Sequence, residues 1–168
     1  MQLFAPGAEW FRVGSIKSIM SSPTPDLAKQ PPRSPRVRLG GYVQLPRMLD
    51  KCRAELGGKN GEYHYNCPLD QEFLSFAGID AEALKQQVAT GAGDGEILGW
   101  ITANAKSKPN SVEIEAWSAQ QERRAPNNPE GREYFNAEHL RVAPQRTDFV
   151  TWFDYLDIDD HASYGGKV

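Results

Sequence analysis

With 168 residues and 39% hydrophobic side chains, including four tryptophans and seven phenylalanines, the chain can fill one hydrophobic core but not two full domains. Its net charge of −3 conceals an asymmetry: residues 21–60 carry eight Lys or Arg against three Asp or Glu, whereas residues 61–168 carry nine against eighteen. Because the excess of Lys and Arg is small and confined to one segment, the sequence disfavours nucleic-acid binding. We expect the two regions to face one another or water within one fold.

No run of eighteen apolar residues occurs, so the sequence predicts no membrane-spanning helix and no membrane partner. The first nineteen residues also lack the continuous apolar region of a secretory signal and the Arg and Ser enrichment of a transit peptide. The chain has only two cysteines, Cys52 and Cys67. Together these features predict a soluble, cytoplasmic protein in which both thiols are free.

Residues 1–25 are predicted to be disordered or an extension of the folded part. Met20 opens the segment "MSSPTPDLAKQ", which resembles a natural start, so residues 1–19 are expected to be an upstream extension. The alternative is a genuine but loosely packed arm. Five prolines between residues 21 and 35 favour an extended lead-in over a regular element.

The first predicted helix follows the glycine pair at residues 40–41 and ends at the pair at residues 57–58. Its opposite face is polar, which predicts that Cys52 is an inert core thiol. The apolar stripe consists of Leu45, Met48, Leu49, Cys52 and Leu56. The polar face carries Arg47, Asp50, Lys51 and Arg53.

Start and stop signals predict the next three helices. Pro68 suits the first position of a short helix that Cys67 caps and Gly78 ends. Asp80 caps a helix that runs to about residue 91. Asp94 is expected to cap a third helix, which runs to about residue 105.

Three further helices complete the prediction. Asn110 and Glu113 form a capping pair for a helix that runs to about residue 124. Asn128 and the following proline begin a helix that reaches about residue 142. Thr147 is expected to cap the last helix, which ends near Leu156.

No segment shows four or more residues of strict alternation with β-branched enrichment. The sequence therefore predicts an all-α fold: a compact single domain of six to seven short helices over residues 26–157, with an extended, Pro-rich N-terminal lead-in. Residues 158–168 are predicted to be a flexible tail. The acidic group before and within it lacks the glycine and terminal glutamate of a calcium loop and is expected to be a solvated helix end. This group is Asp154, Asp157, Asp159 and Asp160.

Reactive side chains are densest between residues 33 and 70. Cys67, at a predicted helix N-terminus, would face unpaired N–H groups that stabilise a thiolate. His64 could act as its base, with Asp70 or Glu62 orienting the imidazole, which gives the elements of a cysteine nucleophile. The alternative is that Cys67 is a small capping residue and that His64 binds a loop carbonyl.

The same segment could receive a carboxylate or phosphate, because guanidinium groups offer paired donors in a fixed plane. Glycines at residues 40–41 and the helix N-terminus near Pro46 would add free backbone N–H groups. The alternative is a basic strand paired with the acidic later half of the chain. The predicted ligand-binding residues are Arg36, Arg38, Arg47, Lys51 and Tyr65.

The cysteines and the three histidines form no CxxC or HxxxH pair, so the sequence predicts no metal site. No cofactor is expected.

The segments "PRSPRVRLGGYVQLPRMLDKCRA", "GEYHYNCPLD", "FLSFAGIDAEALKQQV" and "GDGEILGW" resemble a bacterial family described as domain of unknown function 5069. The resemblance is dense from about Asp26 to Trp100 and looser to about Leu156. It implies a compact, free-standing bacterial domain that begins near Met20. It implies no catalytic residues.

Two hypotheses follow. The first is a cytoplasmic helical binding module that receives a small anionic molecule or an acidic protein surface through residues 36–65. The second is a small thiol-dependent enzyme with Cys67 as nucleophile and His64 as base. The sequence leaves the choice and the oligomeric state open.

Overall fold

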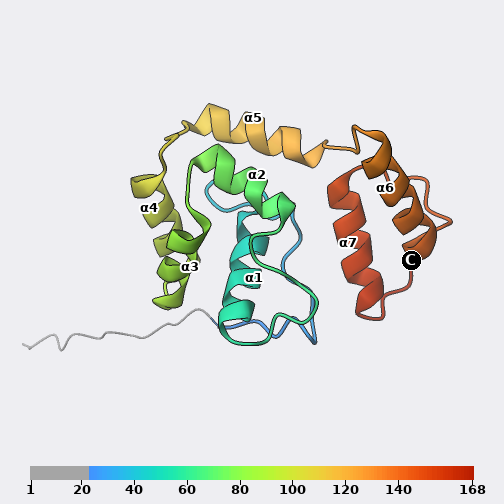
Figure 1. Cartoon of the computed structure of the whole chain (residues 1–168), viewed down its shortest axis with the longest axis horizontal. Helices are drawn as coiled ribbons and strands as arrows, with labels where there is room; N and C mark the ends of the chain where they lie inside the picture. The colour runs from blue at the N-terminus through green and yellow to red at the C-terminus, as the bar shows by residue number, and fades with distance from the viewer. Residues whose placement is uncertain (1–22) are drawn as a thin grey trace, which may run out of the picture.

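The computed structural model describes residues 23–168, and this part of the chain folds into seven α-helices without a β-strand (Figure 1). The all-α prediction is therefore confirmed for the described residues. The predictions for residues 1–19 and for a start at Met20 lie outside them. The helices are α1 (Leu45–Leu56), α2 (Pro68–Ala77), α3 (Ala81–Ala89), α4 (Asp94–Asn104), α5 (Ser111–Glu122), α6 (Pro129–Val142) and α7 (Trp152–Ser163).

Helix α1 is the centre of the larger hydrophobic core. Its predicted apolar stripe is buried except for Leu56, and it packs against apolar side chains of α2, α3 and α4, such as Phe73, Leu84 and Ile97. The opposite face is buried as well, although its charged residues favour water. Arg47 and Lys51 are each only 3% exposed, because acidic side chains from α7 and α2 cover that face.

The helix starts largely follow the predicted caps. The Asn110 side chain accepts hydrogen bonds from the backbone at Val112 and Glu113, and the Glu113 carboxylate accepts one from the Asn110 N–H. One cap differs by a single residue: Gly93, not Asp94, is the N-cap of α4. The glycine has no side chain to cap with, and the Glu96 carboxylate accepts a hydrogen bond from its N–H instead.

The prediction for the last helix was wrong at both ends. Helix α7 is capped by Thr151, not Thr147, and the hydroxyl of Thr151 accepts a hydrogen bond from the Asp154 N–H at 3.2 Å. The Asp154 carboxylate accepts one in return from the Thr151 N–H at 2.7 Å, which completes a capping box. The helix continues past Leu156 to Ser163.

The acidic residues of α7 are not a solvated helix end. Asp160 is buried and bound to Arg47, whereas Asp154 and Asp157 pair with Arg36. Just beyond the helix, the Tyr164 hydroxyl donates a hydrogen bond to the Leu27 carbonyl at 2.5 Å. These long-range contacts hold residues that local sequence signals assign to a tail.

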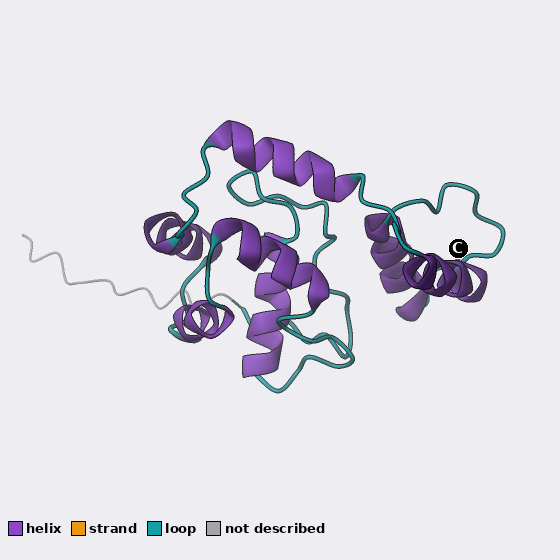
Figure 2. Ribbon diagram, turned by 45° about the horizontal axis from the view of Figure 1, so that its top comes forward, coloured by secondary structure: helices purple, strands orange, loops and turns teal. Residues whose placement is uncertain are grey.

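Helices α6 and α7 pair with each other beside the body formed by α1–α5 (Figures 1 and 2). They share a small core of their own, in which the rings of Phe135 and Phe149 lie 4.8 Å apart. Polar contacts attach this pair to the body, such as the ion pairs of Arg36 and Arg47 with α7. None of the helices in the described residues is long and apolar enough to cross a membrane.

Loss of the Asp160 carboxylate should destabilise the protein more than loss of an exposed one. We expect Asp160→Ala to lower the free energy of unfolding by roughly 3–5 kcal/mol, because Arg47 would remain buried without its counter-charge. Its neighbour Asp159 pairs with exposed Arg141, so Asp159→Ala should cost at most about 1 kcal/mol. Urea unfolding followed by tryptophan fluorescence measures both. Equal losses in the two variants would contradict this role of Asp160.

Candidate functional site

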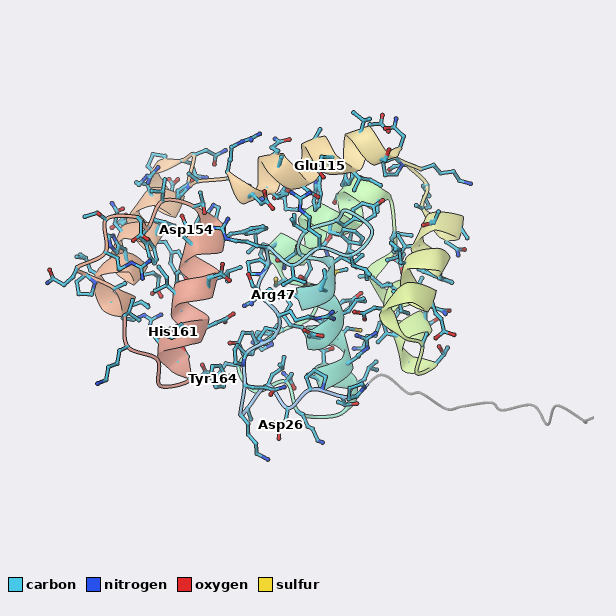
Figure 3. The ribbon with its side chains drawn as sticks, turned by 180° about the vertical axis from the view of Figure 1, so that it is seen from behind. Asp26, Arg47, Glu115, Asp154, His161 and Tyr164 are labelled. Carbon is cyan, nitrogen blue, oxygen red and sulfur yellow. The ribbon has the colours of Figure 1, made fainter. Side chains whose placement is uncertain are left out.

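A pocket of about 680 Å³ lies between three parts of the chain: α1, the loop at residues 61–67 and α7. Helix α1 and its N-cap contribute Gln44, Arg47 and Lys51 to the wall. The loop contributes His64 and Cys67. Figure 3 shows Arg47 in the space between α1 and α7. The structure therefore brings part of the basic segment together with the cysteine-containing loop.

The carboxylate of Asp70 lies behind the pocket wall and binds two of its residues, Gln44 and Lys51. Asp70 lies in the first turn of α2 and is completely buried. It accepts hydrogen bonds from Lys51 Nζ at 2.8 Å, from Gln44 Nε2 at 3.0 Å and from the Cys67 N–H at 3.3 Å. Because a buried carboxylate is costly unless paired and hydrogen-bonded, these three contacts fix the positions of Lys51 and Gln44.

Cys67 has a lysine as its direct partner. Lys51 Nζ donates a hydrogen bond to Cys67 Sγ at 3.1 Å. Cys67 is the N-cap of α2, so its sulfur also lies near the free N–H groups of the first turn. The side chain is partly exposed and lines the pocket, whereas the Lys51 ammonium is buried behind it. The ammonium beside the sulfur is itself paired with the Asp70 carboxylate, as Arg47 is with Asp160.

Gln44 combines backbone strain with an unused acceptor. Its φ of 65° lies in the left-handed region, which costs a non-glycine residue about 1 kcal/mol or more. The side chain is 2% exposed, and its Nε2 is committed to Asp70. Its Oε1 is buried and has no hydrogen-bond partner among the described residues. Gln44 thus lines the pocket and holds a buried acceptor that lacks a donor and that solvent does not reach.

The α7 side of the pocket is neutralised. Arg47 donates to both carboxylate oxygens of Asp160, at 2.5 and 3.1 Å, and the Tyr63 hydroxyl donates to the same carboxylate at 2.7 Å. Burial and this hydrogen bond both raise the pKa of Tyr63, so the phenol remains protonated. Burial lowers the pKa of Arg47, but the hydrogen bond to Asp160 and the negative charges nearby together raise that pKa above its ordinary value. Arg47 is thus a paired cation in the wall, not a free anion receptor.

Three predicted ligand-binding residues lie away from the pocket. Arg36 is bound by the acidic residues of α7, and Arg38 pairs with two glutamates of α5, at 2.5 and 3.0 Å. Tyr65 is buried in the main core, where its hydroxyl donates to the Ala81 carbonyl at 2.8 Å. The pairing of the basic segment with the acidic later half therefore accounts for Arg36 and Arg38. Of the five predicted residues, Arg47 and Lys51 line the pocket.

His64 lines the pocket from an exposed position in the loop. Within the described residues it has no hydrogen bond to Cys67, Asp70 or Glu62, and Asp70 is directed at Lys51 instead. The sequence analysis missed Lys51 as the partner of the thiol. A signal was present: Arg47 and Lys51 are four residues apart, so they share one face of α1 and point to one place.

The second thiol has a different environment. Cys52 is fully buried in the main core, and burial raises its pKa to about 12. This agrees with the prediction of an inert core thiol. No group of three or more His, Cys, Asp or Glu side chains in residues 23–168 is arranged to hold a metal ion.

The family model for the domain of unknown function DUF5069 matches residues 29–162. The chain belongs to this family. The matched part of this DUF5069 chain includes α1–α6, all of α7 except Ser163, and the pocket wall from Gln44 to Asp160. No curated protein matches the chain.

The two thiols should differ in reactivity while the protein is folded. At pH 8.5 we expect iodoacetamide to label one thiol, Cys67, because the Cys52 thiol is buried and remains protonated below about pH 12. In guanidinium chloride both should react. Intact-mass measurement counts the labels, and peptide mapping locates them. Labelling of native Cys52 at the rate of Cys67 would contradict the described core.

Proposed function

We propose that this protein is a binding module for a small organic acid, and that the pocket between α1, the loop at residues 61–67 and α7 is its binding site. The observation that carries the proposal is the convergence of Lys51, His64 and Gln44 on the wall of one pocket of about 680 Å³. Gln44 also holds a buried acceptor without a donor among the described residues, at a cost of roughly 1–3 kcal/mol. The residue is also held in a strained backbone conformation, and such strain clusters at binding sites.

The neighbouring groups indicate what else the ligand carries. An ammonium has three N–H donors, and Lys51 uses two of them, for Asp70 and Cys67. One donor is left for a ligand. His64, at the exposed rim, adds a second group that can face an anion. Lys51 and Gln44 are bound to the two oxygens of one carboxylate, so they lie within the span of one small molecule. The fitting chemistry is a carboxylate with a neighbouring hydroxyl, amine or amide.

A small molecule fits the contacts better than an acidic protein surface. Arg36 and Arg38, two of the cations in residues 36–65, are already bound to the acidic residues of this chain. A volume of about 680 Å³ also lies within the range of small-ligand pockets, roughly 300–1,000 Å³.

A thermal-shift screen against hydroxy acids, amino acids, acylated amino acids and phosphates tests the proposal. A ligand present at a hundred times its Kd should stabilise the protein by about 2.7 kcal/mol and raise its Tm. We expect Gln44→Leu and His64→Ala to weaken binding at least tenfold, because the first removes a hydrogen bond to the carboxylate that positions Lys51 and the second removes a polar group from the pocket wall. His161→Ala is the matched control, since His161 is exposed and does not line the pocket.

Absence of any stabilising acid would count against the proposal, as would a ligand whose affinity is the same in all three variants. In the first case, capture of an acidic protein that depends on His64 would favour the alternative partner.

One contact favours a second candidate function, thiol-dependent catalysis: the hydrogen bond from Lys51 Nζ to Cys67 Sγ. In this proposal Lys51 supports the thiolate, Asp70 positions Lys51, and His64 exchanges protons at the rim. Incubation with an activated ester should give a burst of leaving group close to one equivalent per chain, and Cys67→Ser should abolish it. A burst that persists in Cys67→Ser would exclude this role.

A further inference from the structure

We propose that the α6–α7 pair is a hinged lid over the pocket: the lid turns about the start of α7, and the hydrogen bonds of Asp160 and Tyr164 act as its latch. The inference goes beyond the proposed function, because the motion does not depend on what the pocket binds. It gives the buried pair of Arg47 and Asp160 a part in access to the pocket.

The lid and the body share no common apolar core. Helices α6 and α7 pack along each other, and neither packs closely along a helix of the body. The apolar cores of the two parts are separate clusters. Within the described residues the chain passes from the body to the lid once, through residues 123–128. Two parts that are joined by one segment and lack a large apolar interface are expected to move relative to one another.

The start of α7 is the attached end of the lid. The Trp152 N–H donates a hydrogen bond to the Arg124 carbonyl at 3.0 Å, which ties the helix to the connecting segment. The next residue, Phe153, is fully buried, and the Arg36 guanidinium lies 5.8 Å from the centre of its ring. Arg36 also pairs with Asp154 in the same turn. Burial and an ion pair therefore hold this end, which makes it the pivot.

The far end of α7 is held to the body by hydrogen bonds. Arg47 and the Tyr63 hydroxyl donate to the Asp160 carboxylate. Just beyond the helix, the Tyr164 hydroxyl donates to the Leu27 carbonyl, and Figure 3 shows Tyr164 at the end of α7 that lies far from α5. In the described part of the chain, the last two turns of α7 add no residue to the core of the body. Hydrogen bonds are short and directional, so a small turn of the helix breaks these contacts together.

The pocket lies at the latch end of the lid. Its opposite wall consists of α1 and the loop at residues 61–67. A rotation about the start of α7 displaces the far end of the helix most, so release of the latch moves this wall away from α1 and widens the entrance. The wall residues that α7 and the chain just after it contribute all lie beyond the first turn of the helix: Leu156, Asp159, Asp160, Ser163 and Tyr164.

Pairs of spin labels on the full-length chain measure the motion. The first pair is attached at Val112→Cys on α5 and Leu140→Cys on α6, because both side chains are exposed and neither lines the pocket. The reference pair, at Val112→Cys and Leu56→Cys, lies within the body. Both pairs are placed in the Cys67→Ser background, where the remaining thiol, Cys52, is buried. Double electron–electron resonance gives the distribution of each distance.

Two variants weaken the latch. Asp160→Asn removes the negative charge and keeps the shape of the side chain, and opening of the lid then returns the uncompensated Arg47 to water. Tyr63→Phe/Tyr164→Phe removes two hydroxyl hydrogen bonds between the lid and the body and leaves the buried charges paired. Should Asp160→Asn fail to fold, the double tyrosine variant decides alone.

In both variants we expect a second, longer Val112–Leu140 distance in at least about one tenth of the molecules, whereas the parent chain shows mainly one distance. The reason is that each variant removes contacts that only the closed lid makes. Tyr155→Phe is the matched control and should leave the distribution unchanged, because the Tyr155 hydroxyl is hydrogen-bonded to Tyr134 and Glu138 within the lid.

A single distance in every folded latch variant would overturn the lid. An equal change in the reference pair would also overturn it, since the whole chain would then have loosened, and so would a longer distance in Tyr155→Phe. These outcomes are distinct from failure of the proposed function: the distances are measured without a ligand, and the thermal-shift screen tests acid binding without the labels.

Discussion

The carboxylate of Asp70 is the interaction on which the described site depends. It is fully buried at the first turn of α2, and its two oxygens are satisfied by Lys51, Gln44 and the Cys67 N–H. A charge in that position is stable only when it is paired and hydrogen-bonded. One constraint therefore fixes how α1 meets α2, where the ammonium lies beside the sulfur, and which way the Gln44 amide is turned.

A second buried pair determines where the pocket is open. Arg47 on α1 and Asp160 on α7 hold the α6–α7 pair against the body, and the apolar cores of the two parts are separate clusters. Buried ion pairs contribute more to specific alignment than to net stability, because desolvation offsets most of their attraction. These polar contacts position α7 beside α1, and the pocket lies next to them.

The fold was largely predictable from local sequence, and the site was not. Caps such as that of Asn110 with Glu113 depend only on residues three positions apart, so they can be recognised in a short stretch of sequence. The same rule explains the error at α7: Thr151 has an acidic residue three positions later, whereas Thr147 has a valine. Partners far apart in sequence follow no such rule. Nearness in sequence favoured His64 as the partner of Cys67, but the lysine sixteen residues earlier is its partner in space.

Gln44 combines two energetically unfavourable features, an unpaired buried acceptor and a strained backbone, and such features can mark a functional site. Two other buried polar atoms lack a well-directed hydrogen bond, on Asp94 and Arg124, but each lies within 3 Å of an opposite charge. The Gln44 oxygen has no such compensation, and its backbone is strained as well. Rotating the amide would not help, because the oxygen would then face the Asp70 carboxylate, replacing attraction by repulsion. The Gln44 amide is oriented by the same carboxylate that holds Lys51 beside Cys67, so one buried charge fixes the arrangement of two residues of the pocket wall.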